Sequence, residues 1–370
     1  MANDAIDPPS LNIPESVISV TVRVIDTGSR ASVPAAAFLE PAIPGHEILE
    51  GSPAYPILVE HESGQKVIFD LGIRKDWQNF SPALLKLFEV AGVTIEGDND
   101  VIDVLEEGGI SKEKINAVIW SHWHFDHVGD TSRFAPSTEL VVGPGFSAAL
   151  TPGYPVNKDS PILETDYKDR PLRELDFTAK ATVKLGRFDA LDYFGDGSFY
   201  LLNAPGHTVG HICALARTTP KTFVFMGGDA CHHCGEFRPT QYLPIPAELS
   251  PSPLTNPPFV PETFCPGSLF QSIHPLKSAS QPFYKPKNDP SLLQNYAETE
   301  ITIEKLIEFD ANNDVLTIIA HDRSLLDVLD FFPASVNDWK ANGWRTTGMW
   351  RFLADFRPAL DYVSAEDNES

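Results

Sequence analysis

The chain has 370 residues, of which 42% are apolar, and its formal net charge is −23. This length and apolar content exclude global disorder and provide a core for one large domain or two. The acidity argues against nucleic acid as a partner, because proteins that neutralise phosphates concentrate Lys and Arg.

The first residues, 1–16, are polar, contain three prolines and predict a flexible lead. They have neither the basic region nor the apolar run of a secretory signal, and no stretch approaches the ~20 apolar residues that span a bilayer. Four cysteines in so long a chain do not make a disulfide framework. We therefore expect a cytoplasmic protein without a membrane partner. The sequence leaves open whether it is a monomer or a homodimer.

The first third of the chain alternates strand patterns with two helical ones. Short apolar runs bounded by Gly, Asp or Ser are typical of strands, and apolar residues three and four positions apart are typical of helices. These patterns predict a strand at 17–25, a hairpin of strands at 55–60 and 66–71, helices at 82–90 and 100–107, and a buried strand at 115–120.

A dense group of metal-ligand side chains follows the last of these strands. His122, His124, Asp126 and His127 lie within six consecutive positions of the segment Trp-Ser-His-Trp-His-Phe-Asp-His. Imidazoles and a carboxylate suit a borderline metal ion such as zinc. The cluster therefore predicts a metal site with hydrolytic chemistry.

The remaining regular patterns are again short apolar runs and one helical stripe. They predict strands at 140–142, 198–203, 212–216 and 222–226, a helix at 298–309 and a strand at 315–320.

Residues 235–296 interrupt this pattern. Thirteen of the 32 prolines lie there, and proline fits neither a helix interior nor a central strand. We therefore predict an irregular insert without a regular helix, which is either a substrate-covering lid or a mobile loop. The acidic composition of residues 359–370 predicts a frayed tail.

Three more ligand-type residues follow predicted strands or lie in tight turns. His207 lies in Pro-Gly-His-Thr, Asp229 in Gly-Gly-Asp and His321 in Ala-His-Asp. Together with the first cluster, this ordered set resembles the metallo-β-lactamase superfamily over roughly residues 17–332. The resemblance implies an α/β fold, a four-layer αββα sandwich, for one catalytic domain at 17–358.

The resemblance also implies which residue holds which ion. It implies that the ligands of a first zinc ion are His122, His124 and His207, and that those of a second are Asp126, His127 and His321. It also implies that the carboxylate of Asp229 bridges the two ions. Two adjacent cations can activate water and polarise a carbonyl group. Iron or manganese could occupy the same ligands.

Several residues near these motifs have expected supporting roles. We expect Asp70 and His211 to orient ligands by hydrogen bonds, although His211 fits equally well as a buried histidine with its partners satisfied. Asp322 could orient a ligand in the same way, but we favour it as the cap of a helix at 325–331. The histidines outside any motif are expected to be structural, and they are His46, His61 and His274.

Within the superfamily, the chain resembles the N-acyl homoserine lactone lactonases and fungal lactamase-like hydrolases. The lactonases have a Tyr three residues after the bridging Asp, where this chain has His232. We expect His232 or His233 to donate a hydrogen bond to the substrate oxygen or to protonate the leaving group. Either would complete a catalytic set with Asp126 and Asp229. The flanking Cys231 and Cys234 lack further ligands for a structural zinc and are expected to be buried.

Aromatic residues suit an apolar, ring-shaped substrate, unless they belong to core or lid packing. They are Trp123 and Phe125 among the ligands, and Phe259, Phe264, Phe270 and Phe283 in the insert. We therefore expect a dinuclear zinc hydrolase that opens the lactone or lactam ring of a small, largely apolar substrate. A thioesterase acting on polyketide-type or glutathione-type thioesters and an inactive metal-binding scaffold remain alternatives.

Overall fold

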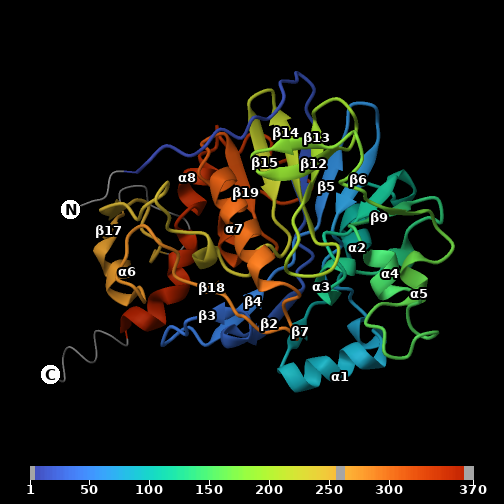
Figure 1. The fold of residues 1–370 in the computed structure, drawn as a ribbon, viewed down its shortest axis with the longest axis horizontal. Coiled ribbons are helices and arrows are strands. Elements are labelled where there is room, and N and C mark those ends of the chain that lie inside the picture. Colours follow the sequence, from blue (N-terminus) through green and yellow to red (C-terminus); the bar gives the residue numbers. More distant parts are fainter. Residues whose placement is uncertain (1–4, 256–262, 362–370) are drawn as a thin grey trace.

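Two six-stranded sheets dominate the computed structural model, which describes residues 5–255 and 263–361 (Figure 1). The first sheet has the strand order β1-β5-β6-β8-β9-β10. Its strands are β1 (Thr21–Val24), β5 (Ile57–Glu60), β6 (Lys66–Phe69), β8 (Ala117–Ile119), β9 (Glu139–Val142) and β10 (Leu172–Glu174). The predicted hairpin is confirmed, because β5 and β6 pair antiparallel. The strands from β6 to β10 are parallel, so their carboxyl ends lie at one edge.

The second sheet has the order β11-β12-β13-β14-β15-β19. Its strands are β11 (Val183–Leu185), β12 (Phe188–Asp192), β13 (Phe199–Asn203), β14 (Ile212–Thr219), β15 (Thr222–Met226) and β19 (Val315–Ile318). Neighbours from β11 to β15 are antiparallel, whereas β19 pairs parallel with β15. A parallel neighbour requires a crossover, and α7 (Tyr296–Asp310) lies in the connection between these two strands.

The central core lies between the sheets, and each sheet is also covered on its outer face. Alternate residues of a strand point to opposite faces. In β5, Ile57 and Val59 therefore face the other sheet, whereas Leu58 packs with the helices outside. In β13, Leu201 faces inward and Leu202 outward. Burial on both faces explains the nearly continuous apolar runs, and the predicted αββα sandwich is confirmed.

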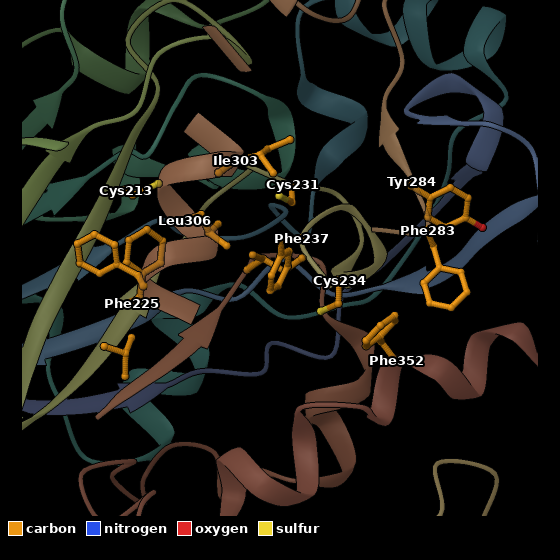
Figure 2. Packing of buried hydrophobic residues seen from close by; sticks show 14 of the residues in the cluster. Cys213, Phe225, Cys231, Cys234, Phe237, Phe283, Tyr284, Ile303, Leu306 and Phe352 are labelled. Atoms are coloured by element: carbon orange, nitrogen blue, oxygen red, sulfur yellow. The ribbon is translucent and has the colours of Figure 1, made fainter. Parts of the chain in front are cut away.

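The outer layers are formed by helices of different length. On the first sheet, Phe88 of α1 (Pro82–Ala91) and Leu105 of α2 (Val101–Glu107) are buried. On the second sheet, α7 buries Ile303 and Leu306 near Phe225 of β15 (Figure 2). The shorter helices are α3 (Phe125–Val128), α4 (Phe146–Leu150), α5 (Glu164–Tyr167), α6 (Ser268–Ile273) and α8 (Trp344–Gly348).

Capping residues fix the ends of the longer helices. Ser81 accepts a hydrogen bond from the amide of Leu84 at 3.3 Å, and Pro82 occupies the first helical position of α1, where its missing N–H costs nothing. Gly92 ends α1 with a φ of 69°, a conformation that favours glycine. Asn295 caps α7 by accepting from the amide of Glu298 at 3.3 Å.

The proline-rich segment is mostly irregular and packs beside α7. Its short pieces are β16 (Glu248–Leu249), β17 (Cys265–Pro266), α6 and β18 (Lys285–Pro286), of which β18 pairs with β3 (Leu39–Glu40). The predicted absence of a regular helix is wrong for α6, because the stretch between Pro266 and Pro275 is long enough for more than one turn. Phe259 lies outside the described residues.

The strands β16 and β17 form a two-stranded sheet, and a three-stranded one has the order β4-β2-β7. Its strands are β2 (Arg30–Pro34), β4 (Ile48–Ser52) and β7 (Thr94–Glu96). Among residues 5–255 and 263–361, no helix has the length and apolar content needed to cross a bilayer.

Candidate metal centre

The ligand-type residues all follow the carboxyl ends of strands that meet at one edge of the sandwich. Asp70 follows β6, the His122–His127 cluster follows β8, His207 follows β13, Asp229 follows β15 and His321 follows β19. Backbone hydrogen bonds hold these loops together. The amide of Ile212 donates to the carbonyl of Ser121 at 2.9 Å and joins the two sheets, and that of Ala320 donates to the carbonyl of Gly228 at 3.1 Å within the second sheet.

The Asp229 carboxylate lies between two groups of histidines. Its Oδ2 is 3.6 Å from Nε2 of both His122 and His207. His124 completes this side, because its Nδ1 is 3.1 Å from Nε2 of His207. His122, His124, His207 and Asp229 therefore form one potential ligand set whose donor atoms lie within 4.8 Å of one another.

The other oxygen of Asp229 faces the second group. Its Oδ1 is 3.0 Å from Nε2 of His127 and 3.1 Å from Nε2 of His321. Asp126 Oδ2 lies 3.5 Å from the same nitrogen of His321. Asp126, His127 and His321 form a second potential ligand set, so both groups expected from the resemblance are brought together around one carboxylate.

Several buried polar atoms of this cluster lack a well-directed hydrogen bond. They are Nε2 of His122, His127 and His232, Nδ1 of His207, and Oδ1 of Asp229. Such buried atoms cost free energy unless a partner satisfies them. Nitrogen and carboxylate donors aimed into one small space fit divalent metal ions of the borderline class.

The protonation of the histidines differs between the two sides of Asp229. Burial lowers the pKa of His122 and His207 and brings the pKa of His124 to about 3, so these imidazoles are neutral, as metal ligands must be. Burial opposes charge at His321 too, but Asp229 and Asp126 outweigh it and raise the pKa of His321 to about 9. The carboxylates on this side thus favour a nearby positive charge.

Asp70 orients a ligand of the second group. Its Oδ2 is 2.7 Å from Nδ1 of His127, and its Oδ1 accepts the amide of Ser121 at 2.6 Å. Asp70 has a φ of 61°, a conformation that Asp and Asn adopt more readily than most residues. The carboxylate fixes the ring so that Nε2 points toward Asp229. Similarly, His321 Nδ1 donates to the carbonyl of Pro53 at 2.7 Å.

His211 combines both roles that its sequence context allowed. Its Nδ1 donates to the carbonyl of Ala204 at 2.8 Å, and its Nε2 accepts the amide of Asp229 at 3.1 Å. It is therefore a buried histidine with both nitrogens satisfied, and it also positions the backbone of the bridging residue.

The structure separates His232 from His233. His232 Nε2 lies 3.6 Å from Asp229 Oδ2, and its ring packs on Phe38 with a centroid distance of 4.4 Å. His233 points elsewhere, because its Nδ1 accepts the amide of Gly235 and its Nε2 faces Asp355 at 3.4 Å. Only His232 is positioned near the metal ligands, so the geometry disfavours a catalytic role for His233.

Glu236 is a supporting residue that sequence reasoning missed. Its Oε2 accepts the amides of His232 at 2.6 Å and His233 at 3.1 Å, and burial raises its pKa to about 8. The local sequence carries little signal for it, because the capping position three residues earlier is His233 and not the Ser or Thr of the usual pattern. The carboxyl group thus fixes the backbone that presents His232.

An apolar cavity of about 430 Å³ opens above the cluster. His124, Asp126, Asp229, His232 and His321 lie at its polar end. Its other walls come from β2, β4 and α1 and from Trp123 and Phe125, and they are mainly Ala31, Val33, Phe38, Leu49, Leu84, Leu87 and Phe88. Sequence analysis missed the contribution of α1 and of the β2–β4 sheet, because nothing local in their sequence indicates that they approach the ligands.

The described aromatic residues of the insert do not line this cavity. Phe270 and Phe283 are buried in the outer core, as Figure 2 shows for Phe283 beside Phe352, whereas Phe264 is exposed. Of the described residues of 235–296, Ser291 and Leu292 line the cavity. Core packing, the alternative to a lid, therefore holds for Phe270 and Phe283.

The other sequence expectations concern residues away from the cluster. Asp322 caps a 3-10 helix at Arg323–Asp327 by accepting from Ser324, so the cap is found but the helix is shorter than predicted. Cys231 and Cys234 are buried and unbridged, and Cys234 donates to Asp322 at 3.2 Å. His61 and His274 have hydrogen-bond partners in turns, as expected for structural histidines.

Comparisons with known proteins agree with this geometry. Residues 49–218 match the family model described as the metallo-beta-lactamase superfamily. The chain is 43% identical to "Gamma-lactamase FDB1" of Fusarium pseudograminearum, over 98% of this chain and 88% of that protein. It is 46% identical to "Metallo-hydrolase mfmC" of Annulohypoxylon moriforme, over 96% of this chain and 92% of that protein.

A solved mutant of the B. thuringiensis AiiA protein, with N-decanoyl-L-homoserine bound at its active site, has a similar fold. Its TM-score is 0.55 at 16% identity, over 86% of this chain and 99% of that chain.

Proposed function

The chain belongs to the metallo-β-lactamase superfamily and is a metal-dependent hydrolase, and from this premise we propose that it opens the ring of a small, largely apolar lactone or lactam at a dinuclear zinc centre. The observation that carries the proposal is the position of Asp229. Each of its oxygens faces a separate set of ligand-type residues, and both sets lie at the end of an apolar cavity.

We assign the first zinc ion to His122, His124 and His207, and the second to Asp126, His127 and His321. Asp229 would bridge them. Two zinc ions held in this way would supply an activated water and a Lewis acid for the carbonyl oxygen. Ring opening joins the oxygen of one water to the carbonyl carbon and breaks the C–O or C–N bond. One proton of the water passes to the ring heteroatom, the other is released to solvent, and a carboxylate is left.

His232 is the residue of the chain best placed to act on the substrate. Burial lowers its pKa to about 4, so the imidazole is neutral near pH 7. A neutral imidazole carries one N–H, which can donate a hydrogen bond to an oxygen that gains negative charge. We therefore propose His232 as the hydrogen-bond donor to the carbonyl oxygen and not as a protonated acid.

The cavity supports the substrate class. Within the described part of the chain, its lining contains neither Lys nor Arg, so an anionic group away from the metal end would find no counter-charge there. Apolar walls and the rings of Trp123, Phe125 and Phe38 suit a neutral ring. The names of two relatives, a gamma-lactamase and a metallo-hydrolase, agree with this class.

A hydrolysis screen tests the proposal. Purified protein is offered γ- and δ-lactones, small aryl lactams, β-lactams and acyl thioesters, each with and without a chelator. We expect at least one lactone or lactam to be hydrolysed and the activity to be lost with chelator and restored by zinc. Preferred hydrolysis of thioesters would favour the thioesterase alternative, and no turnover of any compound by metal-loaded protein would favour the inactive scaffold.

A further inference from the structure

A second cavity, of different character, lies beside the metal centre. Its volume is about 290 Å³, and its lining includes His46, His233, Arg323, Asp355 and Arg357. The apolar cavity described above has neither Lys nor Arg in its described lining. The two cavities therefore offer opposite environments to a molecule at the metal centre.

The cavities share part of their walls. Leu49, Ser52, His232 and His321 line both of them. His232 and His321 also lie within 3.6 Å of the Asp229 carboxylate. The polar cavity thus adjoins the metal centre at His232 and His321.

The histidines of the polar cavity are not arranged as a third metal site, although His46, His233 and Asp355 come within 4.8 Å of one another. The amide of Gly235 donates to Nδ1 of His233 at 3.0 Å, so the proton of a neutral ring is on Nε2, which faces Asp355 at 3.4 Å. A metal ion at Nε2 would need the lone pair of that nitrogen. The His233 ring therefore presents an N–H donor, whereas Nδ1 of His46 is already engaged with the hydroxyl of Tyr284 at 2.6 Å.

The wall of the polar cavity contains guanidinium groups. They belong to the exposed side chains of Arg323 and Arg357, and the acids Glu50 and Asp355 line the same cavity. One oxygen of Asp355 is turned toward His233. A carboxylate is poorly accommodated among apolar walls and is well matched by guanidinium groups.

We propose that the polar cavity binds carboxylates and is the exit route for the acid produced by ring opening. The inference rests on the proposed function, because only hydrolysis converts the neutral ring into a carboxylate. A neutral substrate then occupies the apolar cavity, and its charged product leaves through the polar cavity, past His232.

The experiment uses metal-loaded protein and sodium 4-hydroxybutyrate, the product of γ-butyrolactone opening, in a calorimetric titration. Ala354→Trp fills the polar cavity from a half-buried position in its wall. Arg323→Gln removes one cation at the surface and is the second variant should Ala354→Trp fail to fold. Ala91→Trp is the matched control, because it narrows the apolar cavity from another half-buried alanine.

We expect Ala354→Trp to weaken 4-hydroxybutyrate binding about fivefold or more and Arg323→Gln about threefold, with Ala91→Trp within about twofold of wild type. In turnover assays, Ala354→Trp should lower steady-state kcat more than the single-turnover rate, since release becomes limiting. Equal binding in all four proteins, no binding to wild type, or a larger loss in Ala91→Trp would overturn the proposal. If the wild-type protein hydrolysed no ring, the proposed function would fail. The titration with 4-hydroxybutyrate would still test whether the polar cavity binds carboxylates.

Discussion

At the scale of single residues, Asp229 organises the metal centre. Its Oδ1 lies 3.0–3.1 Å from one pair of histidines, and its Oδ2 lies 3.6 Å from another. A carboxylate can bridge two ions when each oxygen faces its own ligand set. Replacing Asp229 would therefore affect both ions, whereas replacing a supporting residue should affect one.

Substitution of His232 tests its proposed role as hydrogen-bond donor to the substrate. We expect His232→Phe to lower kcat/KM about tenfold or more, equivalent to ~1.4 kcal/mol of transition-state stabilisation, with metal content unchanged. His233→Phe is the matched control, because His233 is adjacent but faces Asp355, and its effect should be smaller. If His232→Phe stayed within about threefold of wild type, under ~0.7 kcal/mol, His232 would not be the donor.

Asp70 tests the idea that one ligand group can be weakened alone. Asp70→Asn keeps the size of the side chain and tolerates the φ of 61°, but it removes the charge paired with His127. We expect affinity for the second ion to fall about 10- to 100-fold while the first is retained. Titration of metal-free protein with zinc would show this as one tight and one weakened site. Two unchanged sites would contradict the assignment.

At the scale of elements, α5 contains a buried acid that makes stability depend on pH. Burial raises the pKa of Asp166 from its usual 3.8 to about 7, and its Oδ2 accepts the amide of Leu163 at 3.0 Å. Between these pKa values the folded protein keeps a proton that the unfolded chain releases. The contribution of Asp166 to the free energy of unfolding is therefore fully present below about pH 4 and is lost as the pH rises through 7.

Asp166→Asn cannot ionise and should flatten this dependence. We expect the variant to gain stability relative to wild type at pH 8 and to differ less at pH 5, measured by urea unfolding. Asp169→Asn, at an exposed position two residues beyond α5, is the control and should follow wild type at both values. An unchanged pH slope in Asp166→Asn would show that the buried carboxyl is not responsible.

The helix α1 connects a local sequence signal with the cavity. Ser81 caps it, and Leu84, Leu87 and Phe88 line the apolar cavity. Ser81→Ala should cost about 1 kcal/mol of unfolding free energy and should also raise KM for the substrate, because the cavity wall loosens. A loss of stability without any change in KM would separate the helix from substrate binding.

Local sequence explains why many elements and ligands were predictable. Apolar runs such as 222–226 are buried on both faces, and Ser81, Pro82 and Gly92 mark the ends of α1. The ligands lie in dense motifs at strand ends. The cavity walls were not predictable, because Leu49 and Phe88 approach the centre only through tertiary packing. The direction of His233 likewise depends on hydrogen bonds with Gly235 and Asp355.

At the scale of the whole molecule, metal binding and folding should be coupled. The ligands come from loops of both sheets, so ions bound there join the two halves of the sandwich. Ions that bind the folded state alone stabilise it by mass action. We expect removal of metal by chelator to lower Tm by more than about 3 °C, and zinc to restore it. An unchanged Tm would place the ions outside the folded core of the molecule.

The most direct test of the central claim is the metal content of the protein, purified without chelator and measured by elemental analysis on samples also assayed for ring opening. We expect two divalent ions per chain. We also expect ring-opening activity to be lost when the ions are removed and to return when they are added back. Less than one ion per chain in active protein, or ring opening by metal-free protein, would contradict the central claim.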